Sequence, residues 1–271
     1  MSLPASALPP HLPSRLPRMS ALSFALTIGA AAIILVSIGQ VAPSFERLAN
    51  GLPNMGNLLW RMSPPNTDPA FLLRIFWRIV ETFQIALAGA AIGIVFSLPI
   101  AWAAARGIGP FGRVGAFLFK ALISFLRTVP DLVWALLFVA TVGLGAVAGT
   151  MTIVVDTIGF CGRFFAEAME DAEKEPQEAL ATIGANRLSI LMGAILPDIM
   201  PSLINTSLFA LEKAIRSSVV LGLVGAGGIG QELKVAFDLF QYRNASTIIL
   251  LIFVIVLVME WATDRLRAKV Q

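Results

Sequence analysis

The residues whose spacing most suggests chemistry are Gly225, Gly227 and Gly230, which satisfy the pattern G-x-G-x-x-G. In a dinucleotide site these glycines follow a strand, open a helix and precede an acidic residue by about 20 positions. Here a long apolar run precedes them, no βαβ pattern surrounds them, and Asp238 follows too closely. We therefore exclude a nucleotide site. We interpret Gly225, Gly227, Gly228 and Gly230 as a sharp turn that serves a gating segment.

Charged side chains within apolar runs are the second candidate arrangement. Arg127 and Asp131 are four residues apart, as are Glu212 and Arg216, so each pair can meet on one helix face, whereas Asp156 stands alone. A charge at membrane depth costs at least ~2.5 kcal/mol and usually faces a cavity or a partner. Two interpretations stay open: the pairs only hold a bundle together, or cations line a path for an anion. The candidates for such a path are Arg216 first, then Arg127, Lys213 and Ser217.

Composition sets aside a water-soluble enzyme as the leading interpretation. Only 14% of the 271 residues are charged, 57% are hydrophobic and the mean hydropathy is +0.81, whereas a soluble domain carries roughly a quarter charged residues. Cys161 and His11 are the single cysteine and histidine, so no disulfide and no Cys/His metal cage can form within the chain. The net charge of +3 is weak support for nucleic acid, because basic cytoplasmic loops explain it.

Six apolar runs are long enough to cross a membrane, which takes about 20 helical residues. They cover residues 21–40, 79–105, 115–143, 146–165, 198–224 and 246–261, and a break at Arg127–Asp131 interrupts the third. The predicted fold is all-α, a polytopic bundle of six transmembrane helices in one domain, residues 21–271. We expect a disordered cytoplasmic leader at 1–20, no cleaved signal peptide, and an irregular loop at 41–74.

The basic residues predict the orientation of the bundle. Most Lys and Arg residues fall on the face that also carries both termini, so we expect both termini in the cytoplasm. Arg74 and Arg78 depart from this rule, because they crowd the outer start of the second run. An interfacial helical turn would accommodate them.

The longest polar stretch lies within the predicted cytoplasmic loop 166–197. Pro176 is suited to open a short helix and Gly184 to end it. Asn186 can cap the next helix, which we expect to end where it meets Pro197. Defined caps indicate a structured loop rather than a solvated linker.

The short helix has one apolar face, because Ala179, Leu180 and Ile183 stand at helical spacing. Such a face favours insertion into the groove of a soluble partner. An ordinary loop helix packed on its own protein is an equally good interpretation of these residues alone.

The segment Glu178-Ala179-Leu180, followed by Gly184 and by Ile195-Leu196-Pro197, resembles the EAA loop of ABC-importer permease subunits. Leu180 replaces a small residue of that pattern, and Ala194 stands where it has Ile. The resemblance implies a type I ABC importer permease in the bacterial inner membrane, without catalysis or cofactor of its own. It also implies that this loop is a coupling helix, and the coupling residues would be Glu178, Ala179, Leu180, Gly184 and Ala185.

The resemblance also implies partners. These are a second copy of the chain, an extracytoplasmic substrate-binding protein, membrane lipid, and two cytoplasmic ATPase subunits that bind ATP and Mg. The chain contains no Walker A sequence, so it cannot supply the ATPase itself.

The segment from Ile215 to Leu233 is similar to permease subunits of phosphonate importers. Methionine-importer permeases share its Gly-Ala-Gly-Gly portion, but Arg216-Ser217-Ser218 and Gln231-Glu232-Leu233 favour phosphonate or a related phosphorus oxyanion. The alternatives are an ABC permease for methionine or another amino acid and, less favoured, a secondary transporter without an ATPase. The latter would have inverted repeats or proton-relay acids, for which Asp156 is the sole candidate.

Overall fold

The computed structural model describes residues 20–41 and 45–268, and all regular structure within these ranges is helical, as predicted. The helices are α1 (Ala21–Val41), α2 (Phe45–Met62), α3 (Pro69–Ala104), α4 (Gly112–Thr128), α5 (Asp131–Val142), α6 (Ala146–Asp171), α7 (Lys174–Thr182), α8 (Arg187–Ile190), α9 (Leu196–Gly222), α10 (Gly228–Asp238) and α11 (Tyr242–Arg267). A π-helical segment, Leu191–Ile195, joins α8 to α9.

The chain divides into two units, residues 1–57 and 58–271. In the first unit, α1 is long and apolar enough to cross a membrane, and the Ser20 hydroxyl caps it by accepting a hydrogen bond from Ser23 N at 3.2 Å. The predicted leader otherwise lies outside the described residues.

The prediction of an irregular loop at 41–74 was wrong, because residues 45–62 form α2. Pro and Asn are typical of loops, but Leu52, Met55 and Leu59 recur at helical spacing, and the helix accommodates Pro53. Side-chain periodicity thus prevails over composition here.

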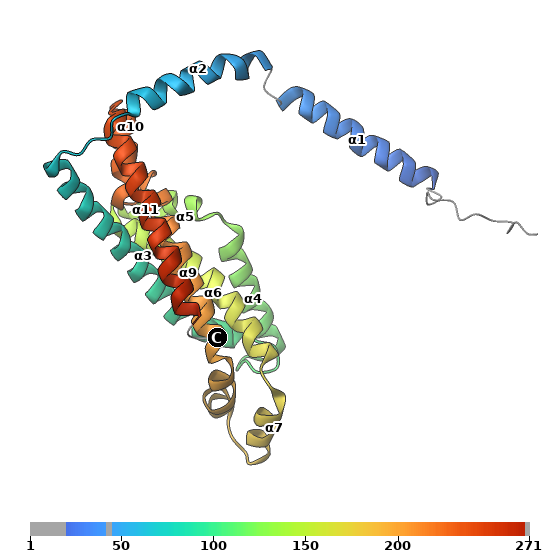
Figure 1. Ribbon diagram of the computed structural model, residues 1–271. Helices are drawn as coiled ribbons and strands as arrows, with labels where there is room; N and C mark the ends of the chain where they lie inside the picture. The colour runs from blue at the N-terminus through green and yellow to red at the C-terminus, as the bar shows by residue number, and fades with distance from the viewer. Residues whose placement is uncertain (1–19, 42–44, 269–271) are drawn as a thin grey trace, which may run out of the picture. The chain divides into compact units, whose positions relative to one another are not determined.

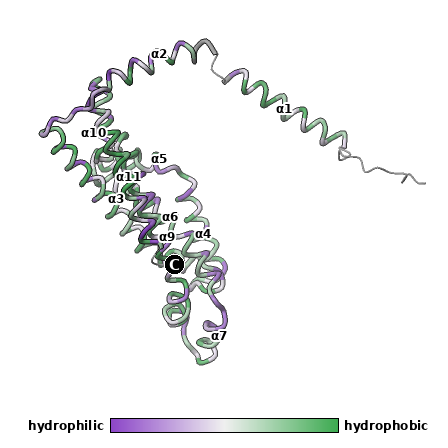
Figure 2. Tube along the Cα trace, viewed as in Figure 1, coloured by the Kyte–Doolittle hydropathy of each residue, from purple (hydrophilic) through white to green (hydrophobic). Residues whose placement is uncertain are grey.

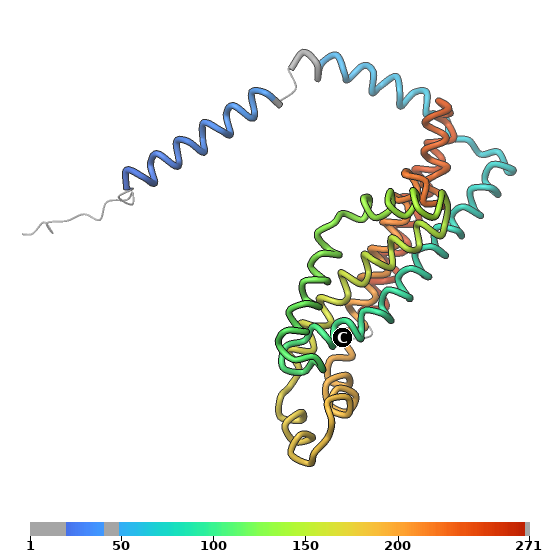
Figure 3. Tube along the Cα trace, turned by 180° about the vertical axis from the view of Figure 1, so that it is seen from behind, coloured from blue at the N-terminus to red at the C-terminus, as the bar shows by residue number. Residues whose placement is uncertain are grey.

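In the second unit, α3, α6 and α9 pack side by side, while α4 and α5 lie against α6 and α11 against α9 (Figures 1 and 3). Small residues allow α3 to approach α6 closely. A Cβ atom placed on Gly89 would lie 2.7 Å from Ile153 Cβ, and one on Gly93 would lie 2.5 Å from Thr157 Cβ. Such close packing of small residues is typical of membrane helices.

Among the described residues, five helical segments can cross a membrane by length and composition, and α4 with α5 adds a sixth if this bent pair counts as one span. Apolar residues follow these helices along their length (Figure 2). The α4–α5 pair bends by 87°. Pro130 causes the predicted break, because it lacks an N–H and holds Val129 in extended geometry, with φ −78° and ψ 120°.

One helix begins well before its predicted span. Helix α3 begins at Pro69 rather than near residue 79, because Asp68 caps it by accepting a hydrogen bond from Phe71 N at 3.2 Å.

Helix α7 and the end of α11 lie at one end of the bundle, and α5 and α10 lie at the other (Figures 1 and 3).

Candidate functional site

The segment 166–197 contains the short helix that the sequence predicted, with one shift in its start. Helix α7 begins at Lys174, so Pro176 lies within the first turn rather than at its first position. Gly184 follows the helix with φ +83°, and the Asn186 side chain accepts a hydrogen bond from Ser189 N at 2.8 Å, as predicted.

The prediction that the next helix ends at Pro197 was wrong. Helix α8, the π-helical segment and α9 run on as one candidate span, residues 187–222. Pro197 falls in the first turn of α9, directly after the π-helical segment, where its missing N–H is tolerated. The short polar loop is therefore continuous with a membrane helix.

The apolar face of α7 is divided rather than uniform. Glu178 and Ala179 are exposed, and Ile183 is 79% exposed. Leu180 is half-buried, and its Cδ1 lies 3.5 Å from the position of a Cβ atom on Gly193. The helix thus packs on its own protein through Leu180 and leaves the side with Glu178, Ala179 and Ile183 uncovered.

The two ends of α7 are fixed to the bundle. Glu173 N donates to Asp198 Oδ2 at 3.0 Å, and the half-buried Ala185 donates from its N to Leu180 O at 3.0 Å. Arg187 donates a hydrogen bond to the Gly109 carbonyl, in the loop between α3 and α4. A displacement of α7 would therefore be passed to α9 and to that loop.

The intramembrane charges form contacts that the sequence predicted only in part. Glu212 and Arg216 pair at 2.9 Å, as expected from their spacing. Glu212 also pairs with Arg267 of α11 at 2.7 Å, and Arg267 in turn lies 3.8 Å from Asp264. Two arginines therefore share Glu212, whose side chain is only 13% exposed.

Lys213 and Asp156 form an ion pair, with Lys213 Nζ 2.7 and 2.8 Å from the two carboxylate oxygens of Asp156. The sequence suggested that Asp156 stands alone, and the structure corrects this. The pair joins α9 to α6, so sequence spacing within one helix held no signal for it.

The prediction that Arg127 and Asp131 can meet was wrong, because the helix breaks between them and bends. Asp131 instead accepts a hydrogen bond from Ser217 Oγ at 3.1 Å. Among the described side chains, which are those of residues 20–40 and 49–268, Arg127 has no carboxylate within 4.0 Å. Its guanidinium lies 5.9 Å from the centre of the Phe164 ring.

Three aromatic rings connect these charges. Phe160 lies next to both Phe164 and Phe209, with ring centroids 4.9 and 5.6 Å apart. Lys213 and Arg267 lie over Phe160 and Phe209, at 5.3 and 5.2 Å from the ring centres. A hollow of about 450 Å³ opens beside the rings. We call the following residues the charged belt: Arg127, Asp131, Asp156, Glu212, Lys213, Arg216, Ser217 and Arg267.

The glycine pattern forms a sharp turn between α9 and α10, as predicted, without any strand beside it. Gly228 has φ +73°, and a Cβ atom there would lie 2.5 Å from Thr82 Oγ1. Ile229 N donates to the same Thr82 oxygen at 2.8 Å, and Gly145 N donates to Gly225 O at 2.9 Å. The turn is thus held against α3 and against the start of α6.

Glu232 is a residue whose contacts the sequence did not predict. It lies on α10, where it accepts a hydrogen bond from Arg78 Nε at 3.1 Å and lies 3.7 Å from Arg74 Nε. Arg78 also pairs with Glu81 at 2.7 Å. The crowding of arginines at this end of α3 was the available signal, because cations on a membrane helix usually have partners.

A family model described as "binding-protein-dependent transport system inner membrane component" matches residues 93–271 of the chain. The chain belongs to this family. It is therefore a multi-pass inner-membrane permease subunit of an ABC importer, as the loop motif indicated. The match includes α7, the glycine turn and every residue of the charged belt.

Two curated relatives carry names that concern phosphorus compounds. The permease is 36% identical over 221 residues to the phosphite transport system permease protein PtxC of Stutzerimonas stutzeri, which covers 81% of this chain and 79% of that protein. It is also 36% identical over 217 residues to the phosphate-import permease protein PhnE of Mycolicibacterium smegmatis, which covers 80% of this chain and 40% of that longer protein.

A solved structure shares the fold of the permease. The inward-facing methionine ABC transporter MetNI matches with a TM-score of 0.62 and 24% sequence identity, over 76% of this chain and 100% of that chain. At this identity the likeness concerns the fold alone. The methionine protein is more distant in sequence than the phosphite and phosphate permeases.

Proposed function

We propose that the permease imports a phosphorus oxyanion such as a phosphonate, phosphite or phosphate. The observation that carries the substrate class is the 36% identity, over about four fifths of the chain, to permeases named for phosphite and phosphate transport. The Arg216-Ser217-Ser218 and Gln231-Glu232-Leu233 stretches around the glycine turn support the same class. A substrate-binding protein on the outer face delivers the ligand.

The coupling partner is a pair of cytoplasmic ATPase subunits, which bind ATP and Mg. Helix α7 suits this role because Glu178, Ala179 and Ile183 are exposed on a helix that is fixed at both ends. An exposed apolar side chain such as Ile183, on a helix that also carries the exposed Glu178, is suited to a groove in a soluble protein. The coupling residues remain Glu178, Ala179, Leu180, Gly184 and Ala185, of which Leu180 packs on the permease itself and Ala185 is half-buried.

A second copy of the permease completes the path. The charged belt is only partly covered within one chain, and Arg216 has a side chain that is 56% exposed. Exposed charges on membrane helices are costly against lipid, so this face is expected to meet a second copy or a water-filled path. Two copies would bring two charged belts together around one pathway.

The belt contains one cation, Arg127, that lacks a carboxylate partner among the described side chains. Arg216 and Arg267 share Glu212, and Arg267 also lies 3.8 Å from Asp264. A phosphorus oxyanion would meet a surplus of positive charge at Arg127, which lowers its barrier without requiring tight binding. Lys213 is balanced by Asp156 and therefore contributes less to this surplus.

We propose that α7 and both termini lie in the cytoplasm. The end of α11 lies at the same end of the bundle as α7 (Figures 1 and 3), and the basic residues favour that face as cytoplasmic. The glycine turn and α10 then lie at the outer end. There Gly225, Gly227, Gly228 and Gly230 form a gating turn, which moves as the path opens outward.

The coupling assignment is tested by Ile183→Asp in the complete complex. The buried groove of the ATPase would have to desolvate the new carboxylate, so we expect co-purification of the ATPase to fall at least tenfold. Leu188→Asp is the matched control, because Leu188 is also exposed and lies outside α7. Retention of the ATPase by the Ile183 variant at the level of the control would refute the assignment.

A further inference from the structure

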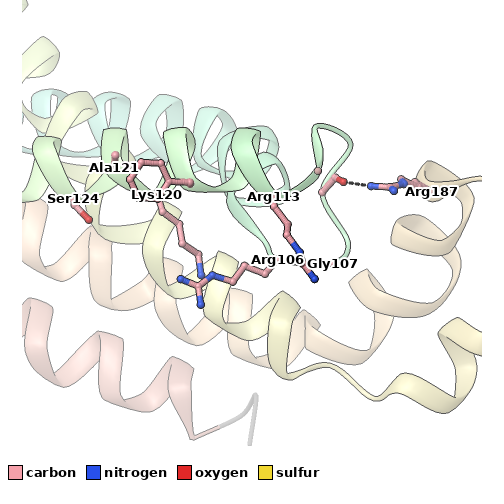
Figure 4. Close-up of a pocket in the computed structure, with 10 residues that line it drawn as sticks. Arg106, Gly107, Arg113, Lys120, Ala121, Ser124 and Arg187 are labelled. Carbon is pink, nitrogen blue, oxygen red and sulfur yellow. Dashed lines mark hydrogen bonds between the residues drawn. The ribbon is translucent and has the colours of Figure 1, made fainter.

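A basic pocket lies beside the start of α4, at the end of the bundle that carries α7 (Figure 4). Its volume is about 880 Å³. Three elements build it: the loop between α3 and α4, one side of α4 and the start of α8. Its lining includes four basic residues, Arg106, Arg113, Lys120 and Arg187. The charged belt does not include any of these residues, and the proposed transport path does not use them.

The positive charge of this pocket is only partly neutralised. Lys120 Nζ lies 2.7 Å from Glu170 Oε1, which also accepts a hydrogen bond from Arg106 N at 2.7 Å. In the part of the chain that the structure describes, neither the Arg106 nor the Arg113 guanidinium has a carboxylate within 4.0 Å. The side chains of Lys120, Arg106 and Arg113 are directed to the same side of α4 (Figure 4). Four cations therefore face one carboxylate.

One wall of the pocket is apolar and continues along a membrane helix. Phe117 and Ala121 line it one turn apart on α4, and Phe117 is 70% exposed. Val114 and Phe125 of the same helix are also exposed. A pocket with basic residues at one end and an open apolar wall beside them matches a phospholipid, which has a phosphate headgroup and acyl chains. Basic pockets between membrane helices on the cytoplasmic side are known to bind anionic headgroups.

We propose that this pocket binds an anionic phospholipid of the cytoplasmic leaflet. Arg106 and Arg113 contact the headgroup phosphate, and an acyl chain follows Phe117 and Ala121. The assignment to the cytoplasmic leaflet rests on the proposed function, because the orientation of the permease is part of that proposal. Arg187 belongs to the coupling segment and donates to Gly109, so the headgroup lies where that segment joins the bundle.

The proposal is tested by native mass spectrometry of the complete permease–ATPase complex. Phosphatidylglycerol is titrated against phosphatidylcholine, and we expect wild type to prefer phosphatidylglycerol. The variant Arg106→Gln with Arg113→Gln should bind phosphatidylglycerol roughly 25-fold more weakly, at about fivefold for each base removed. Arg163→Gln with Arg265→Gln is the matched control. It removes the same charge from the same end of the bundle, where Arg163 pairs with Glu167 and Arg265 lies over Trp261.

An equal loss in the test and control variants would overturn the proposal, because attraction would then be general rather than sited. Competition by glycerol phosphate or inorganic phosphate at millimolar concentration would also overturn it, because the site would then hold a small anion. A lack of preference for phosphatidylglycerol in wild type would overturn the proposal as well. The assay needs neither transported substrate nor ATP, so its failure is distinguishable from a failure of the proposed transport function.

Discussion

Single residues of the charged belt differ in whether an opposite charge neutralises them. Lys213 has its own carboxylate in Asp156, and Arg216 shares Glu212 with Arg267. Arg127 lies against Phe164, without a carboxylate partner among the described residues. Within the proposed path, we therefore expect Arg127, rather than Arg216, to have most influence on an anion.

Replacement of this arginine, Arg127→Gln, should lower uptake of the phosphorus oxyanion about tenfold, which corresponds to ~1.4 kcal/mol in barrier height. Arg216→Ala should lower uptake less, because Arg267 remains beside Glu212. Uptake by proteoliposomes measures both, with Arg163→Gln as the control outside the belt. Normal uptake by the Arg127 variant, at normal protein amounts, would remove Arg127 from the path.

The pair between Lys213 and Asp156 is expected to hold α9 against α6. Asp156→Asn alone leaves Lys213 without its partner, whereas the double variant with Lys213→Gln removes both charges. We expect a coupling free energy of about 0.6–1.7 kcal/mol from the double-mutant cycle, measured by unfolding of the detergent-solubilised protein. Additive effects of the two substitutions would mean that the contact contributes nothing to stability.

The sequence could predict contacts of single residues only where both partners lie on one helix. Glu212 and Arg216 follow from a spacing of four. The contacts of Lys213 with Asp156 and of Ser217 with Asp131 depend on how α9 is rotated against α5 and α6. That rotation follows from packing across the whole bundle, which no local pattern encodes.

Among the helices, the sequence predicted the spans better than their ends. Long apolar runs identified α1, α3, α6, α9 and α11, and Pro130 identified the break between α4 and α5. The start of α3 was missed because Arg74 and Arg78 made its first turns appear unsuited to a span. Glu81 and Glu232 neutralise them, and Glu232 comes from α10, so only the fold reveals this compensation.

The turn that joins α9 to α10 should be sensitive to one added methyl group. Gly228→Ala places a Cβ atom 2.5 Å from Thr82 Oγ1 and also demands a positive φ. The left-handed backbone alone costs roughly 1–2 kcal/mol, and the clash adds to it. Gly112→Ala is the matched control, because Gly112 is also the first residue of a helix and has φ +66°, but no atom lies within 4 Å of the added Cβ.

We expect the Gly228 variant to unfold at a lower temperature than the Gly112 variant, in thermal unfolding of the detergent-solubilised permease. The difference between the two reports the contact with Thr82, which holds the turn on α3. Equal melting temperatures would mean that this contact is not tight in solution, and that the turn moves freely.

For the whole molecule, the sequence established the class of protein and the structure located its surfaces. The pattern around Glu178 and Gly184 was sufficient to indicate an ABC importer permease, and the family match confirms this. The division of α7 into a packed and an open side was not predictable, because it depends on contact between Leu180 and the segment around Gly193. In the proposed function, the open side of α7 meets a soluble partner and the charged belt meets a second copy of the permease.

The most direct test of this account is uptake by proteoliposomes that contain the permease, its ATPase and its binding protein. We expect ATP-dependent accumulation of a phosphonate, phosphite or phosphate, and none when either the ATP or the binding protein is omitted. Methionine, supplied under the same conditions, should not accumulate. Accumulation of methionine in place of the phosphorus compounds, or accumulation without ATP, would contradict the account.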